Sequence, residues 1–197
     1  MEWQFDFCGG HLALDFANTV SDRHTTAPIE RIYGYPDLVS FARQTGVVTA
    51  GQAAALLGRA RRDDRAAGRS HARAVALRNA LYRLFAAVAR QEPPAVEDVE
   101  DLDRELDRLC IGADLSLAWR DPPDTLDGFM GAVVHDAVRL VTDPAERSRV
   151  RLCEAPDCVW LFYDSSRNRS RRWCDMRQCG NRMKARRHYA RGKSGTP

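Results

Sequence analysis

The chain has 197 residues, 44% of them hydrophobic, and a formal net charge of only +3. This composition suits one packed medium-sized domain, or a domain with a small appendage, and it excludes wholesale disorder. No uncharged apolar run approaches the roughly 20 residues that span a membrane, and the N-terminus lacks the features of a signal peptide. We therefore expect a cytoplasmic protein without a membrane partner, whose cysteines are free or metal-bound rather than disulfide-bonded.

The first 144 residues predict a helical domain with a small antiparallel sheet. Trp3, Phe5 and Phe7 alternate with polar neighbours, which indicates a half-buried strand over residues 2–7. Apolar residues then recur at helical spacing, and Thr49 is a suitable N-cap. Helices are expected over residues 12–20, 37–44, 50–62, 70–91, 96–112 and 125–141, with a charged linker over 59–70 and a second strand over 114–120 as a candidate partner of the first.

The small net charge hides a division of the chain. Residues 1–144 contain 16 Arg, no Lys and 22 Asp+Glu, a net of −6, whereas residues 145–197 contain 14 Lys+Arg and 5 Asp+Glu, a net of +9. Such asymmetry is typical of a polyanion-binding appendage on an acidic body. A solvated basic tail would look similar, but four of the six cysteines also lie in this part. We therefore divide the chain into domains 1–144 and 145–197.

Cys153, Cys158, Cys174 and Cys179 form a C-x4-C pair, a gap of fifteen residues and a second C-x4-C pair. Two close pairs at this separation can bring four thiolates to one tetrahedral Zn²⁺. Four protein ligands leave no position for water, so the zinc would be structural. A module this small cannot bury enough surface to fold alone, and zinc binding supplies about 10 kcal/mol in comparable peptides. The alternative is four unrelated buried or free cysteines.

The residues around the cysteines predict a hairpin followed by a helix. Residues 150–152 and 159–163 favour two strands, the turn 154–157 contains Pro156, and residues 180–191 favour a helix. The whole chain is therefore expected to be α+β and mostly α, with a treble-clef or ribbon-like zinc module after the helical domain.

Cys179-Gly180-Asn181-Arg182 reads C-G-N-R and follows Arg171-Arg172-Trp173-Cys174. This run resembles the CGNR zinc finger over about residues 151–191, including Phe162, Asp164, Ser166 and Arg167. Residues 9–20, GGHLALDFANTV, resemble the opening of the ABATE domain, and Tyr35-Pro36-Asp37-Leu38 is similar to the step that follows. The resemblance implies a zinc ion and a nucleic-acid role in stress-induced transcription regulation.

The basic residues of the module are candidates for nucleic-acid binding, because arginine contacts phosphate bidentately and also reads guanine. They are Arg167, Arg169, Arg171 and Arg172 in the loop before Cys174, and Arg182, Lys184, Arg186, Arg187 and Arg191 on the last helix. We expect duplex DNA, with RNA or an acidic protein as alternatives. The neighbouring aromatic residues, Trp160, Phe162, Tyr163 and Trp173, are better explained as a small core than as base-stacking platforms.

The helical domain carries no catalytic motif, so we do not expect an enzyme. Asp15 and Asn18 share a short apolar helix. They are expected to tie that helix to the sheet, or alternatively to line a small effector pocket with His11. Cys8 and Cys110 are isolated in sequence and are expected to behave as small apolar residues, or as a redox pair if their Cα atoms lie within about 7 Å. A small-molecule effector and a homodimer are further candidate partners.

Overall fold

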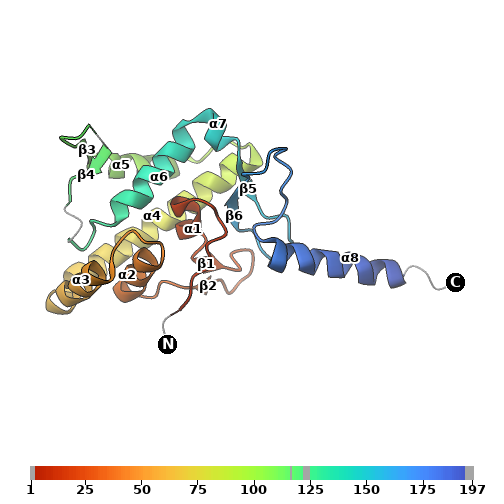
Figure 1. Cartoon of the computed structure of the whole chain (residues 1–197), viewed down its shortest axis with the longest axis horizontal. Coiled ribbons are helices and arrows are strands. Elements are labelled where there is room, and N and C mark those ends of the chain that lie inside the picture. Colours follow the sequence, from red (N-terminus) through yellow and green to blue (C-terminus); the bar gives the residue numbers. More distant parts are fainter. Residues whose placement is uncertain (1–2, 116, 122–124, 194–197) are drawn as a thin grey trace.

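The computed structural model describes residues 3–115, 117–121 and 125–193 (Figure 1). The long helix α4 (Asp64–Arg90) runs through the middle of the body (Figure 1). Helices α2 (Tyr35–Gln44) and α3 (Ala50–Arg62) lie at its N-terminal end. The β5–β6 hairpin lies at its other end, and the last helix projects from there, away from the body.

The remaining helices are α1 (Leu12–Ala17), α5 (Val96–Leu106), α6 (Met130–Thr142), α7 (Pro144–Arg147), the π-helical turn η1 (Met176–Gly180) and α8 (Asn181–Lys193). Within the described ranges, the strands form three separate antiparallel pairs: β1 (Val20–Ser21) with β2 (Ile29–Glu30), β3 (Leu109–Ile111) with β4 (Leu117–Trp119), and β5 (Val150–Leu152) with β6 (Leu161–Tyr163). The chain is mostly helical, as the sequence predicts.

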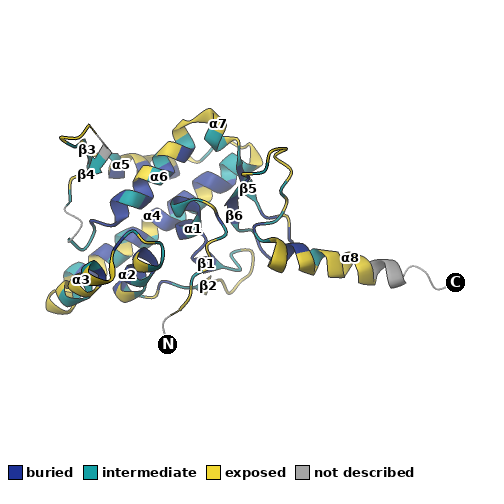
Figure 2. Ribbon diagram, viewed as in Figure 1, coloured by how far each residue is buried: buried dark blue, intermediate teal, exposed yellow. Residues whose placement is uncertain are grey.

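One main core joins the helical body to the β5–β6 hairpin. Buried side chains line the inner faces of α1, α4 and α6 (Figure 2). The cluster includes Leu14, Phe16, Phe41, Leu81, Phe85, Val134, Leu140, Val150 and Leu161. The last two belong to the hairpin, so the strands that precede and follow the first cysteine pair are part of the body's core.

Several predicted elements are confirmed with shifted ends. Helix α3 matches its predicted range, because Thr49 caps it and forms a capping box with Gln52. The predicted linker over residues 59–70 is wrong. Asp63 accepts a hydrogen bond from the Ala66 N–H at 2.8 Å and caps α4, so α4 follows α3 after a single residue.

The predicted N-terminal strand is also wrong over its described residues; Glu2 lies outside them. Residues 3–8 are extended but pair with no described strand. The Gln44 side chain instead accepts from the Phe5 N–H at 3.1 Å and donates to the Trp3 carbonyl at 2.7 Å. Side-chain contacts, among them those of Gln44, therefore hold the start of this segment in place of a strand ladder.

Three predicted helices are shorter than expected. The helix predicted over 12–20 ends at Ala17, and Val20 belongs to β1. The helix predicted over 96–112 ends at Leu106, and the following β3 pairs with β4 within the predicted strand 114–120. Ser116 of that strand lies outside the described residues. The helix predicted over 125–141 begins at Met130. Among the described residues, no helix combines the length and apolar character that a membrane crossing requires.

Asn18 ties the body to the hairpin. Its side-chain nitrogen donates to the Leu161 carbonyl at 2.8 Å, and its oxygen accepts from the Leu161 N–H at 2.9 Å. Asn18 is 2% exposed, so these bonds satisfy two backbone groups that are buried away from water. The Tyr82 hydroxyl adds a third link by donating to the Val159 carbonyl at 2.9 Å.

We predict that Asn18→Ala lowers the free energy of unfolding by about 1–3 kcal/mol, because it leaves both Leu161 backbone groups without their buried partner. Urea denaturation of the full chain would measure the change. Asn168→Ala, at an exposed loop position, is the matched control and should change stability little. Equal stabilities for the two variants would contradict the proposed tie.

Candidate metal centre and basic helix

The four predicted cysteine ligands form one cluster. Their Sγ atoms all lie within 4.8 Å of one another, and all four residues are buried. The Cys158–Cys174 and Cys174–Cys179 sulfur separations are 3.6 and 3.7 Å. A tetrahedral zinc with Zn–S bonds of about 2.3 Å places its sulfurs about 3.8 Å apart. The donor set and the spacing therefore fit one structural Zn²⁺, as the sequence predicts.

The first cysteine pair sits on a turn that closes the β5–β6 hairpin. The Cys153 N–H donates to the Trp160 carbonyl at 2.8 Å, and the Cys158 N–H donates to the Ala155 carbonyl at 3.0 Å. Val159 follows with a φ of 59°, a conformation that strains a β-branched residue. The bond from Tyr82 to the Val159 carbonyl helps to hold this turn.

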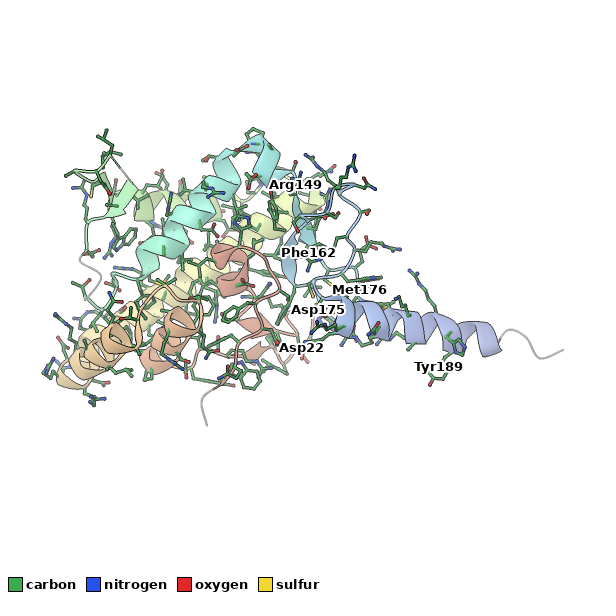
Figure 3. The ribbon with its side chains drawn as sticks, in the orientation of Figure 1. Asp22, Arg149, Phe162, Asp175, Met176 and Tyr189 are labelled. Carbon is green, nitrogen blue, oxygen red and sulfur yellow. The ribbon has the colours of Figure 1, made fainter. Side chains whose placement is uncertain are left out.

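Of the second pair, Cys179 lies in the π-helical turn η1 and Cys174 lies two residues before that turn. The Asp175 carboxylate accepts from the N–H groups of Arg177 and Gln178 at 2.5 and 2.9 Å. The glycine of C-G-N-R is packed closely, since a Cβ on Gly180 would lie 2.5 Å from the Met176 Sδ. The turn leads directly into α8, so the metal ligand Cys179 fixes the start of that helix (Figure 3).

A buried carboxylate organises the loop between the two pairs. Asp164 is fully buried and accepts from Ser166 Oγ at 2.5 Å and from the Arg171 N–H at 3.0 Å. Burial alone would raise the pKa of Asp164, but the bonds from Ser166 and Arg171 lower it below its ordinary value. Asp164 therefore stays ionised and holds the loop in one conformation.

The four sulfurs can all ionise together only if a cation balances their negative charge. Hydrogen bonds among the sulfurs lower the pKa of Cys153, whereas the hydrogen bonds with Cys153 raise the pKa of Cys158 and of Cys174. Four thiolates this close together repel one another, so the protein alone disfavours the fully ionised cluster. A divalent metal supplies the positive charge that lets all four sulfurs ionise.

The aromatic residues of the module form a small core. Phe162 is fully buried in the cysteine cluster, and Trp160 and Trp173 pack against the same cluster. Tyr163 packs on the main core instead. Their placement fits the predicted core role and leaves none of these rings fully exposed.

Two of the predicted nucleic-acid residues of α8 contact the metal module. The Arg182 Nη2 lies 3.3 Å from Cys179 Sγ and 3.2 Å from Asp157 Oδ1. The Arg186 Nη2 lies 3.0 Å from the other oxygen of Asp157. The arginine of C-G-N-R therefore donates to a ligand sulfur, which carries negative charge when it binds zinc, and both arginines link α8 to the first cysteine pair. No sequence pattern predicts these two contacts of Asp157, because its partners lie more than 20 residues away along the chain.

The loop arginines are partly engaged. Arg171 donates from Nε to the Trp173 carbonyl at 2.9 Å and also to the carbonyls of Cys8 and Cys174. Arg172 pairs with Glu154, and Arg169 donates to Ser148 Oγ at 3.0 Å. These bonds hold the loop against its neighbours.

The other candidate residues present charge outward. Arg167, Lys184 and Arg187 are exposed, and within the described part of the chain Arg167 and Lys184 form no ion pair. The side chain of Arg191 lies outside what the structure describes. Helix α8 contains six Lys+Arg and no Asp or Glu, and it is exposed from Asn181 to Tyr189 except at Met183. It packs mainly on η1 and stands clear of the body (Figure 2).

The residues predicted to tie α1 or to line an effector pocket are bonded within the body. Asn18 joins Leu161, His11 Nδ1 lies 2.9 Å from Asp136 Oδ1, and Asp15 accepts from the Gly9 N–H at 2.7 Å. Asp15 and Asn18 border a small cavity that His11 does not line. These bonds are the ones that a structural role requires, and the effector pocket stays a prediction.

The fold and the cysteine geometry define a zinc-finger protein in which a helical body carries a basic C-terminal module. A family model described as "Putative stress-induced transcription regulator" (ABATE) matches residues 10–144, and one described as "CGNR zinc finger" matches residues 149–192. The chain belongs to the ABATE family and carries a CGNR zinc finger. Both are regulatory or zinc-finger families rather than enzyme families. A search of curated proteins found no match.

We predict that Cys158→Ser loses the one bound zinc and lowers the thermal midpoint of the whole chain, because the hairpin that holds this ligand is part of the main core. Metal content and thermal melts, with and without a chelator, would measure both effects. Cys110→Ser is the matched control, since Cys110 lies in β3 outside the cluster. Full metal retention by Cys158→Ser would contradict the assigned ligand set.

The buried carboxyl group of Asp15 makes the free energy of unfolding depend on pH. Burial raises the pKa of Asp15 from 3.8 to about 7, although the bond from Gly9 opposes the shift. Between about pH 4 and pH 7 the folded chain holds this proton more tightly than the unfolded chain does, so Asp15 makes stability fall as the pH rises through that window. We predict that Asp15→Asn gains stability relative to the parent chain from pH 4 to pH 7. Parallel stability curves in urea titrations across this range would contradict the assignment.

Proposed function

We propose that the protein is a DNA-binding transcription regulator that contacts duplex DNA through α8. The single observation that carries this proposal is the exposure of α8: a basic helix without acidic residues, anchored to the metal module through its first turns and clear of the body (Figures 1 and 2). Among residues 181–189 of this helix, Met183 is the one residue that is not exposed, so the helix presents most of its side chains to solvent.

The shape of this helix favours DNA over RNA. An α-helix with its side chains is about 10–12 Å across, and the major groove of B-form DNA, about 12 Å wide, admits one. The major groove of A-form RNA is deep and narrow and excludes it. Single-stranded RNA is often bound by stacking of its bases on exposed aromatic rings. Phe162, Trp160 and Trp173 pack in the small core of the module, which leaves Tyr189 as the large exposed aromatic ring on the described part of α8.

The loop before Cys174 supplies a second contact. Arg167 is exposed at this loop, and Asp164 and Arg171 hold the loop's conformation. The loop and α8 meet at the metal centre, so their relative position is fixed. Phosphate contacts from such a pair of basic elements position a protein on DNA without specifying sequence. The exposed residues of α8 would read the base edges.

The test is a salt titration of the full chain on duplex DNA. Binding should weaken steeply between about 50 and 200 mM salt. We predict that the double variant Arg167→Ala, Lys184→Ala binds more weakly and reduces the slope of log affinity against log salt by about 1 per lost phosphate contact. Arg65→Ala, Arg69→Ala is the matched control. It removes the same charge from exposed positions on α4, and it should leave both quantities nearly unchanged.

Competition with a double-stranded RNA of the same sequence tests the choice of partner. The groove argument expects the DNA duplex to compete better. Equal or stronger competition by the RNA would overturn the proposed binding mode while keeping a nucleic-acid role. A salt-independent interaction, or equal losses in the two double variants, would overturn the DNA-binding proposal itself.

A further inference from the structure

A cavity of about 220 Å³ lies between the N-terminal segment and the metal centre. The residues that matter here are Asp6, Cys8 and Asp22 from the body, and Cys158, Cys174 and Cys179 from the module. Three of the four metal ligands therefore border the same cavity as a cysteine that is not a ligand. In sequence, Cys8 is separated from the nearest of the four by more than 140 residues.

The position of Cys8 beside Cys174 is fixed by specific contacts. The Arg171 Nη2 donates to the carbonyl oxygen of Cys8 at 3.3 Å and also to that of Cys174, so a single nitrogen holds the two backbones next to one another. The Tyr163 N–H donates to the Gly9 carbonyl at 2.7 Å and secures the same segment against β6. The Cys8 side chain is partly buried, packs on the cluster that contains Cys174, and borders the same cavity as Cys174.

We propose that Cys8 is an oxidation site for peroxides and that it forms a disulfide with Cys174, which removes one ligand from the metal centre. Thiolates react with peroxides to give sulfenic acids, and a sulfenic acid condenses with a neighbouring thiol. Cys8 provides the free thiol, the cavity provides access, and Cys174 is the adjacent sulfur. The proposal does not depend on DNA binding.

The reaction balances with hydrogen peroxide as the oxidant. The Cys8 sulfur attacks one peroxide oxygen, the O–O bond breaks, and Cys8 becomes a sulfenic acid while the other oxygen leaves as water. The Cys174 sulfur, which is a thiolate when it binds the metal, then attacks the Cys8 sulfur, so that the S–S bond forms and the S–O bond breaks. The oxygen leaves as hydroxide and takes a proton from solvent to become a second water. Two sulfurs lose two electrons in total, and one peroxide gains them. Three cysteine ligands remain, which is one fewer than a closed structural zinc site holds.

The lining of the cavity selects for a small neutral oxidant. Asp6, Asp22, Asp157 and Asp175 border it together with Arg182, so anionic oxidants and the anionic thiol glutathione are repelled. Hydrogen peroxide carries no charge. Figure 3 shows Asp22 and Asp175 near the start of α8, on the side where the cavity lies.

The experiment treats the zinc-loaded full chain with hydrogen peroxide in the presence of a chromogenic zinc chelator. The rate of zinc release is recorded, and disulfides are mapped by mass spectrometry of unreduced peptides. The parent chain and Cys110→Ser should release zinc and yield a linked Cys8–Cys174 peptide. Cys8→Ser should lose that linked peptide and release zinc more slowly. Cys110 is the matched control because it is also partly buried, but it lies opposite Ala118 in the β3–β4 pair.

The peptide map of the parent chain tests the pairing even if a variant folds poorly, and zinc content before treatment shows whether Cys8→Ser is intact. A thiol reductant with added zinc should restore the metal-bound chain. Disulfides confined to the four ligands, or equal rates of release from the parent chain and an intact Cys8→Ser, would overturn the proposal.

Discussion

The two hydrogen bonds between the Asn18 side chain and the Leu161 backbone fix the position of the zinc module relative to the helical body. They attach β6 to α1 inside the main core, and β6 leads from the first cysteine pair into the loop before the second. The metal centre therefore cannot turn independently of the helical body. Because an isolated helix of this length is marginal in water, α8 depends on the metal centre for a fixed start and on the body for its direction.

Charge restricts the approach of a polyanion to α8. On the side of the cavity, four carboxylates border the start of the helix, and Asp157 pairs with both Arg182 and Arg186. Other exposed cations lie further along α8, on η1 at Arg177 and on the loop at Arg167. A nucleic acid that meets the loop and α8 together avoids the carboxylates. The body thus restricts the direction from which a nucleic acid can approach the basic module, although it does not cover the exposed face of α8.

Local chemistry explains which features the sequence predicts. The cysteine spacing, the Thr49–Gln52 capping box and the 150–163 hairpin depend on residues a few positions apart. The alternation at Trp3, Phe5 and Phe7 predicts a strand, but a strand needs a partner, and here Gln44 takes that place. The charged run around Asp63 hides a helix start because the first turn of α4 is mostly exposed. The contacts of Cys8 and Asp157 join distant residues, so no local pattern could show them.

The charge of the chain and the family matches both divide it near residue 144, but the hydrophobic core does not divide there. The charge changes sign near residue 144, and the two family models meet between residues 144 and 149. The main core nevertheless continues through Val150 and Leu161 into the module. Free energy from metal binding is therefore shared with the helical body, because a hairpin released from the metal would expose part of the body's core. Any change that removes a sulfur ligand, at Cys174 or elsewhere, should therefore destabilise the packing around α1 as well as the start of α8.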